Sequence, residues 1–136
     1  MIKKSLDPKP GVIKKIIPPD GHLKFSMKYF DNEDSEMCPP IFANTYTQAL
    51  MGRLKELSRW TPRDFEICRH KAWRIHTHNW TETSRPDGFK HLPEDFRSLN
   101  GWQFQLSANE HGRVHGFLLN DTFYIVWLDS SHRLYP

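Results

Sequence analysis

The alternation of apolar and polar residues near the C-terminal end constrains the fold of this chain more than any other feature. Between residues 102 and 107 the side chains alternate strictly, which is the period-two pattern of a half-buried strand. Residues 113–119 and 122–129 are two further runs of this kind, separated by Asn120-Asp121, a pair suited to a two-residue type I′ turn. The sequence therefore predicts three consecutive antiparallel strands, the last two joined as a hairpin.

The register of this hairpin predicts two unlike faces. One face holds apolar side chains suited to a core: Val114, Leu118, Phe123, Ile125 and Trp127. The other face mixes charged, polar and apolar side chains: Arg113, His115, Phe117, Tyr124 and Val126. Because a solvent-facing sheet surface does not usually carry such a mixture, we expect a functional site on the second face. The same register pairs His115 with Val126 and Arg113 with Leu128.

Length and composition favour a single folded domain with a short N-terminal arm. A chain of 136 residues, 38% of them hydrophobic, can bury a core without a disulfide or a metal. Residues 1–21 contain four of the ten prolines and five lysines, so we expect an irregular arm there, followed by one domain over residues 22–136.

The composition also bears on location and partners. No apolar run approaches the roughly 20 residues that span a bilayer, and no apolar segment follows the basic start, so we expect neither a membrane segment nor a cleaved secretion signal. Cys38 and Cys68 lack metal-type spacing and are expected to be free thiols in a reducing cytoplasm. The formal charge of +3 is compatible with nucleic-acid binding but does not require it.

The rest of the chain supplies helices and edge strands. Residues 22–30 and 73–78 alternate as strands do, residues 41–60 have helical spacing, and a second helix is predicted from Thr61 to about Arg69. One or two helical turns are expected within 92–99. The predicted class is α+β: a mostly antiparallel sheet with a two-helix layer on one face, in the order β-α-α-β-β-β-β. The other sheet face is expected to be free for a site.

Seven residues near the C-terminal end form the strongest chemical grouping: Arg113, His115, Tyr124, Asp129, His132, Arg133 and Tyr135. Cleavage of RNA requires a base for the 2′-hydroxyl, a cation for the phosphate and an acid for the departing 5′ oxygen. Arginine suits the phosphate, and histidine and tyrosine suit the proton transfers. The alternative is structural: Arg113 pairs with Asp129 across the hairpin ends, and the remainder are ordinary amphipathic sheet residues.

Other polar residues suggest weaker possibilities. His76 and His78 lie on the same face of a predicted strand and could bind a metal if a third ligand came from a neighbouring strand. Lys90, in the long loop before residue 101, is either a phosphate-binding residue or a solvated loop residue. No Gly-rich phosphate loop or other cofactor motif is present, so we expect no cofactor.

The order of elements and the C-terminal residues resemble the RelE/ParE superfamily of toxin components of bacterial toxin–antitoxin pairs. Three segments carry the resemblance: Arg113-Val114-His115-Gly116-Phe117, Phe123-Tyr124-Ile125-Val126-Trp127-Leu128 and His132-Arg133-Leu134-Tyr135. The resemblance is specific over residues 99–136 and looser over 41–70. This chain is longer than typical members, with the arm at 1–21 and an insertion at 79–100, and it is less basic than members that engage the ribosome.

The resemblance implies a messenger RNA endonuclease that works without a metal, on the ribosome or on free RNA, and is neutralised by a cognate antitoxin protein. Arg113 would stabilise the scissile phosphate, and His132 and Tyr135 would be the acid and base. His115 is a further catalytic candidate, and Lys90, Tyr124 and Arg133 are candidates for substrate binding. Two other functions stay open: a non-catalytic protein- or nucleic-acid-binding module, and a metal-dependent hydrolase that uses His76 and His78.

Overall fold

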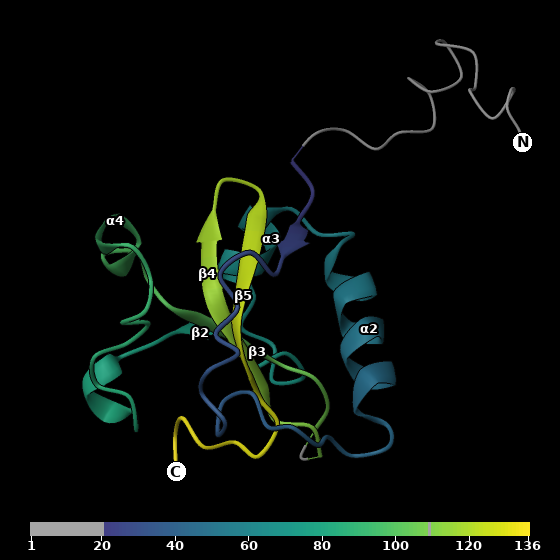
Figure 1. The fold of residues 1–136 in the computed structure, drawn as a ribbon. Helices are drawn as coiled ribbons and strands as arrows, with labels where there is room; N and C mark the ends of the chain where they lie inside the picture. The colour runs from purple at the N-terminus through teal and green to yellow at the C-terminus, as the bar shows by residue number, and fades with distance from the viewer. Residues whose placement is uncertain (1–20, 109) are drawn as a thin grey trace, which may run out of the picture.

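The computed structural model describes residues 21–108 and 110–136, so nearly all of the predicted N-terminal arm lies outside the described residues. The described residues form five strands and three α-helices (Figure 1). Their bounds are β1 Lys24–Ser26, α2 Tyr46–Leu57, α3 Pro62–Ile67, β2 His76–Thr77, α4 Glu94–Arg97, β3 Trp102–Gln105, β4 Arg113–Leu119 and β5 Thr122–Asp129, with a short 3-10 helix at Trp80–Glu82.

All five strands belong to one sheet, in the order β1-β5-β4-β3-β2. Strands β2 to β5 pair as antiparallel neighbours, whereas β1 lies parallel to β5. Helices α2 and α3 carry the chain from the β1 edge of the sheet to the β2 edge. The α+β class is confirmed, and the sheet is mixed because the first strand joins the last one in parallel.

The second predicted helix begins as its sequence indicates. Thr61 accepts a hydrogen bond from the backbone of Asp64, and the carboxylate of Asp64 accepts one from the backbone of Thr61. This reciprocal capping box, followed by Pro62 in the first turn, satisfies amide groups that a helix start leaves unpaired. Helix α2 is shorter than expected and begins at Tyr46. The preceding Thr45 does not cap it, because its hydroxyl is hydrogen-bonded to His111 Nε2 at 2.8 Å.

Helices α2 and α3 pack on one face of the sheet and enclose the main hydrophobic core. Tyr46 and Leu57 of α2 and Phe65 of α3 are buried against Phe104 and Val114 of the sheet. Leu23, Phe123 and Ile125 belong to the same cluster. Because neighbouring residues of a strand point to opposite faces, the position of Val114 places Arg113 and His115 on the face away from these two helices.

The opposite sheet face is covered by a second hydrophobic cluster, so the expectation of a free face is wrong. Phe117, Val126 and Trp127 of the sheet are buried there beneath Met37, Phe89, Leu92 and Leu134. Met37 directly follows the acidic loop after β1 (residues 31–36), Phe89 and Leu92 belong to the insertion at 79–100, and Leu134 belongs to the C-terminal segment (residues 130–136). In Figure 1 the insertion and α4 lie on the side of the sheet away from α2. The insertion therefore closes most of the surface that a site on this face could use.

A β-bulge changes the predicted register of the hairpin. Phe117 pairs with Tyr124 as expected, but Gly116 pairs with Ile125 and His115 with Trp127, so Val126 is the extra residue. Trp127 and Asp129 consequently share a face with His115, and Arg113 pairs with Asp129 and not with Leu128. Isolated glycine within a strand often marks a bulge or a close backbone approach, and Gly116 occupies that position here.

Local backbone geometry shortens the outer strands and alters the turn. β1 ends at Ser26, so it is shorter than the strand expected over residues 22–30, and Met27 is 51% exposed. β2 contains only His76 and Thr77, because Arg74 has a positive φ of 50° that interrupts the extended chain. At the hairpin turn, Asn120 has a positive φ of 58°, whereas Asp121 does not, so the turn is not type I′.

Substituting Gly116 with alanine should destabilise the fold, because the new Cβ would overlap the backbone carbonyl oxygen of Tyr124. Backbone atoms of a paired strand cannot move aside as a flexible side chain can. We expect a loss of about 1–3 kcal/mol in the free energy of unfolding, measured by urea denaturation.

The matched control is Gly52→Ala, within helix α2, where a new Cβ would meet no atom within 4 Å. Alanine is the better helix former, so this variant should gain about 0.5–1 kcal/mol. Equal stability of the Gly116→Ala variant and the wild type would show that the bulge does not depend on a glycine.

Candidate functional site

Strand pairing gathers polar side chains on the sheet face opposite α2 and α3. His76 pairs with Gln103, which pairs with His115 on the next strand. Directly opposed residues of neighbouring strands present their side chains on the same face. One pair further along the strands, Gln105 lies opposite Arg113, and Arg113 lies opposite Asp129. Two polar rows therefore cross this face at the end of the sheet remote from the hairpin turn.

Two of these side chains, His115 and Asp129, form a continuous hydrogen-bonded chain with His78 and Tyr135. Asp129 Oδ2 lies 3.1 Å from His115 Nε2, and His115 Nδ1 lies 2.9 Å from His78 Nε2. His78 Nδ1 in turn lies 2.7 Å from the hydroxyl of Tyr135. We call Asp129, His115, His78 and Tyr135 the buried relay. It runs from the end of β5 through β4 to the residue after β2, and ends in the C-terminal segment.

The chemistry of the carboxylate determines the direction of every hydrogen bond in the buried relay. An ionised carboxylate only accepts, so His115 Nε2 must carry a hydrogen atom. Neutral His115 then accepts at Nδ1, and His78 must donate from Nε2 and accept at Nδ1. The hydroxyl of Tyr135 is therefore the donor to His78. One tautomer of each imidazole thus satisfies the whole chain.

Burial keeps both imidazoles of the buried relay neutral. Desolvation is the main cause that lowers the pKa of His78 from 6.5 to about 2, and repulsion from His115 and His76 adds to it. Desolvation likewise lowers the pKa of His115, although its hydrogen bond to Asp129 opposes this. For Asp129, desolvation acts to raise the pKa, but hydrogen bonds from His115 and from the backbone of Arg133 and Leu134 lower it overall.

The two ends of the buried relay differ in exposure. His115 and Asp129 are 0% and 1% exposed, whereas Tyr135 is partly exposed. The structure therefore corrects the expectation that His115 contacts a substrate, because its imidazole has no accessible surface. The end of the chain formed by His78 and Tyr135, both partly exposed, is the part that a molecule from solution can meet. Burial raises the pKa of Tyr135, so the phenol is protonated at neutral pH.

Arg113 and His132 line one pocket at the end of strands β4 and β5. The pocket has a volume of about 350 Å³, and its other lining residues are Gly112, Ser130 and Ser131. Arg113 Nε is buried and has no hydrogen-bond partner among residues 21–108 and 110–136. Desolvation, and then repulsion from Arg74, lowers the pKa of Arg113. The pocket thus presents a half-buried cation, an imidazole and two hydroxyl groups, which suits an anion such as a phosphate.

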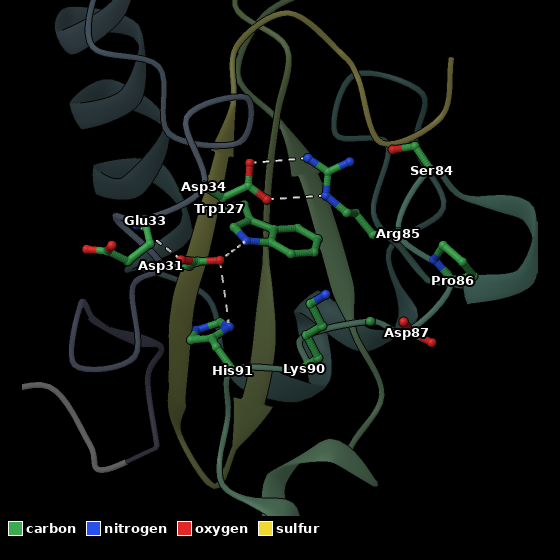
Figure 2. A pocket seen from close by; sticks show the side chains of 11 residues that line it. Asp31, Glu33, Asp34, Ser84, Arg85, Pro86, Asp87, Lys90, His91 and Trp127 are labelled. Carbon is green, nitrogen blue, oxygen red and sulfur yellow. Dashed lines mark hydrogen bonds and ion pairs between the residues drawn. The ribbon is translucent and has the colours of Figure 1, made fainter.

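Lys90 lies elsewhere, in a second pocket of about 520 Å³ between the acidic loop and the insertion (Figure 2). Many polar groups of this pocket bind one another. Arg85 donates two hydrogen bonds of 3.2 Å to Asp34, and Trp127 Nε1 donates one of 3.0 Å to Asp31. No residue lines both this pocket and the one at Arg113. Lys90 is therefore not brought together with the other candidates.

Tyr124 and Arg133 also lie apart from the pocket at Arg113. Tyr124 stacks on Phe117 with ring centroids 5.0 Å apart, in the part of the hairpin nearer its turn. The side chain of Arg133 is 59% exposed and forms an ion pair with Glu36 at 3.7 Å, while its backbone amide donates to Asp129. Arg133 thus connects the C-terminal segment to the acidic loop.

The geometry does not favour metal binding by His76 and His78. Both ring nitrogens of His78 already have protein partners, and His76 Nδ1 lies 2.8 Å from the carbonyl oxygen of Thr77. Within the described part of the chain, no three His, Cys, Asp or Glu side chains are grouped so that they could hold a metal ion. Sequence reasoning missed the hydrogen-bonded link from Asp129 through His115 to His78. The sequence signal that could have revealed it is Gly116, because this glycine marks the β-bulge that places Asp129 on the same face as His115.

Comparison with known proteins returned no matching family model, no similar curated protein and no similar solved structure. Among the described residues, none of the helices is long and apolar enough to cross a membrane. Cys38 and Cys68 are both free, as the sequence predicts. The function must therefore be inferred from the pocket at Arg113 and from the buried relay.

Stability should fall as the pH drops below about 6.5, because unfolding releases His78 from an environment that keeps it neutral. The pKa of His78 is about 2 in the folded protein and 6.5 for an ordinary histidine, so between pH 2 and pH 6.5 the unfolded chain binds one more proton than the folded protein. Stability contributed by neutral His78 is complete above pH 6.5 and is lost below it, by about 1.4 kcal/mol at pH 5.5. His115 acts in the same direction.

Urea unfolding at pH 7.5 and pH 5.5 measures this effect. The His78→Gln variant should lose part of the pH dependence, whereas His70→Gln, at an exposed imidazole, should keep all of it. A wild-type protein as stable at pH 5.5 as at pH 7.5 would contradict neutral imidazoles in the buried relay.

Proposed function

We propose that this protein is a RelE-like toxin component of a toxin–antitoxin pair, an endoribonuclease that cleaves messenger RNA without a metal, on the ribosome or free. One observation carries the proposal: Arg113 and His132, chosen from the C-terminal resemblance, line the same pocket. Residues 19 positions apart in sequence thus supply a phosphate ligand and a proton-transfer group to one cavity.

The pocket supplies two of the three groups that cleavage of an RNA phosphodiester requires, the phosphate ligand and the acid. The guanidinium of Arg113 offers donors to two phosphate oxygens and neutralises the charge that develops on them. His132 is exposed at the pocket, where its imidazole is suited to protonate the departing 5′ oxygen. Tyr135, which we assign to the 2′-hydroxyl, is partly exposed but does not line this pocket. Arg74 lies close enough to Arg113 to affect its pKa and adds positive charge for the RNA backbone.

The arrangement of the elements is compatible with this assignment. Two helices cover one face of the sheet, and Arg113 lies on the other. A RelE-like sheet arrangement, a cytoplasmic location and inhibition by a cognate antitoxin protein belong to the proposal, because they follow from the resemblance of residues 99–136 to that superfamily.

Removing the phosphate ligand, Arg113, or the acid, His132, should slow cleavage strongly. Arg113→Ala and His132→Ala are each expected to cut messenger RNA about a hundred- to a thousandfold more slowly than wild type. Purified protein is incubated with messenger RNA, both free and on translating ribosomes, and the cleavage products are mapped by primer extension.

Arg63→Ala is the matched control, since Arg63 is an exposed arginine of helix α3 on the other face of the sheet. It should cleave at the wild-type rate. If Arg113→Ala and His132→Ala also cleave at that rate, the pocket is not the active site and the proposed function is wrong.

A non-catalytic binding module is the second candidate, because a pocket with a half-buried arginine can bind a phosphate or carboxylate without further chemistry. In that case wild-type protein would leave RNA intact, yet it would bind RNA or an acidic protein more tightly than the Arg113→Ala variant does. Gel-shift titration beside the cleavage assay separates the two functions.

A further inference from the structure

The buried relay contains more polar groups than packing requires, and it ends where a substrate can reach it. His115 and Asp129 lie in the interior, where an apolar side chain would avoid the cost of desolvation, and His78 is partly buried beside them. Each member hydrogen-bonds the next at 2.7–3.1 Å, and the last member is the partly exposed phenol of Tyr135. A buried base linked to an accessible hydroxyl is the arrangement that activates nucleophiles and general bases.

We propose that His78 is the proton acceptor of Tyr135, and that His115 and Asp129 are positioning residues that hold His78 in the tautomer able to accept that proton. This inference rests on the proposed function for the identity of the substrate, but not for the behaviour of the phenol. It assigns to Tyr135 the role of base toward the 2′-hydroxyl and leaves the role of acid to His132.

The hydrogen-bond directions support this assignment. Asp129 holds the hydrogen of His115 on Nε2, which leaves His115 Nδ1 free to accept from His78. His78 must then present the lone pair of Nδ1 to Tyr135, 2.7 Å away. Asp129 is itself held by the backbone amides of Arg133 and Leu134, at 2.7 and 2.9 Å. The residues just before Tyr135 thus anchor the carboxylate at the far end of the same chain.

Proton transfer along this chain balances. The phenol oxygen of Tyr135 takes the proton of the 2′-hydroxyl while its own proton passes to His78 Nδ1. The 2′ oxygen forms a bond to phosphorus, the bond from phosphorus to the 5′ oxygen breaks, and protonated His132 gives its proton to the 5′ oxygen. The products are a 2′,3′-cyclic phosphate and a 5′-hydroxyl end, with His78 protonated and His132 neutral. Exchange with water restores both.

Charged and titratable neighbours favour a neutral resting state in the buried relay. Repulsion from Arg113 and His132 helps to lower the pKa of His115, and the ring of His76 lies 5.9 Å from that of His78, centroid to centroid. Glu82 lies near Tyr135 and disfavours a phenolate there. Burial disfavours the imidazolium that His78 forms during the reaction, because it lowers the pKa of His78 to about 2, and the charge of Asp129 offsets part of that cost.

The first experiment tests the phenol without RNA. An aryl sulfonyl fluoride forms an oxygen–sulfur bond with tyrosine and releases fluoride, and the reaction needs a base to take the phenol proton. Mass spectrometry of the labelled protein should show Tyr135 modified faster than Tyr29 and Tyr124, which are also partly exposed. In His78→Gln, labelling of Tyr135 should slow by at least about tenfold, with Tyr29 and Tyr124 unchanged as internal controls.

The second experiment measures RNA cleavage against pH. Glutamine can accept a hydrogen bond but cannot take a proton, so kcat of His78→Gln should fall about a hundredfold or more with a changed pH profile. Asp129→Asn should also slow cleavage, because an amide NH₂ facing His115 Nε2 favours the opposite tautomer. The exposed variant His70→Gln should match wild type, and urea unfolding identifies any variant that fails to fold.

The outcomes separate this inference from the proposed function. If labelling of Tyr135 depends on His78 but the protein does not cut RNA, the role of His78 as proton acceptor stands and the proposed nuclease function is wrong. If a folded His78→Gln variant cuts RNA with the kcat and pH profile of wild type, the nuclease function stands and the role of His78 as proton acceptor is wrong. Labelling of Tyr135 at the same rate in wild type and His78→Gln would likewise show that this role is wrong.

Discussion

The β-bulge at Val126 is the local constraint on which the candidate site depends. Gly116 allows the β5 backbone to approach closely enough for one extra residue to be accommodated. That residue turns Trp127 and Asp129 onto the face of His115. Without it, the regular alternation of a strand would direct the carboxylate of Asp129 toward α2 and α3, into a cluster of apolar side chains where no hydrogen-bond donor would compensate its desolvation.

Asp129 holds the C-terminal segment of the protein in place. Its two oxygens accept hydrogen bonds from the backbone of Arg133 and Leu134 and from the imidazole of His115. Leu134 can therefore enter the second hydrophobic cluster, and Tyr135 reaches His78. The same carboxylate thus holds the C-terminal segment against the sheet and sets the tautomers of both imidazoles, so the packing of this segment and the chemistry of the site cannot be separated.

Much of the fold could be predicted from local patterns, because strands and caps depend on near neighbours. The bounds of β4 and β5 and the capping box at Thr61 follow directly from alternation and from residue type. The free second face was predicted wrongly, since burial beneath the insertion depends on residues 80–99 folding back over the sheet. The residues that form the site were predicted in part. Arg113 and His132 line the same pocket, whereas Lys90 lines a different one.

By itself the sequence determined the kinds of element, their order along the chain, and which residue types were available for chemistry near the C-terminal end. Periodicity of side chains and the needs of a helix start are local properties, so they can be read from neighbouring residues. Tertiary structure alone decided which of these residues meet. A single unpaired residue in β5 reverses the face of everything after it, and contacts between segments as distant as His78 and Tyr135 exist only once the sheet, the insertion and the C-terminal segment have packed together.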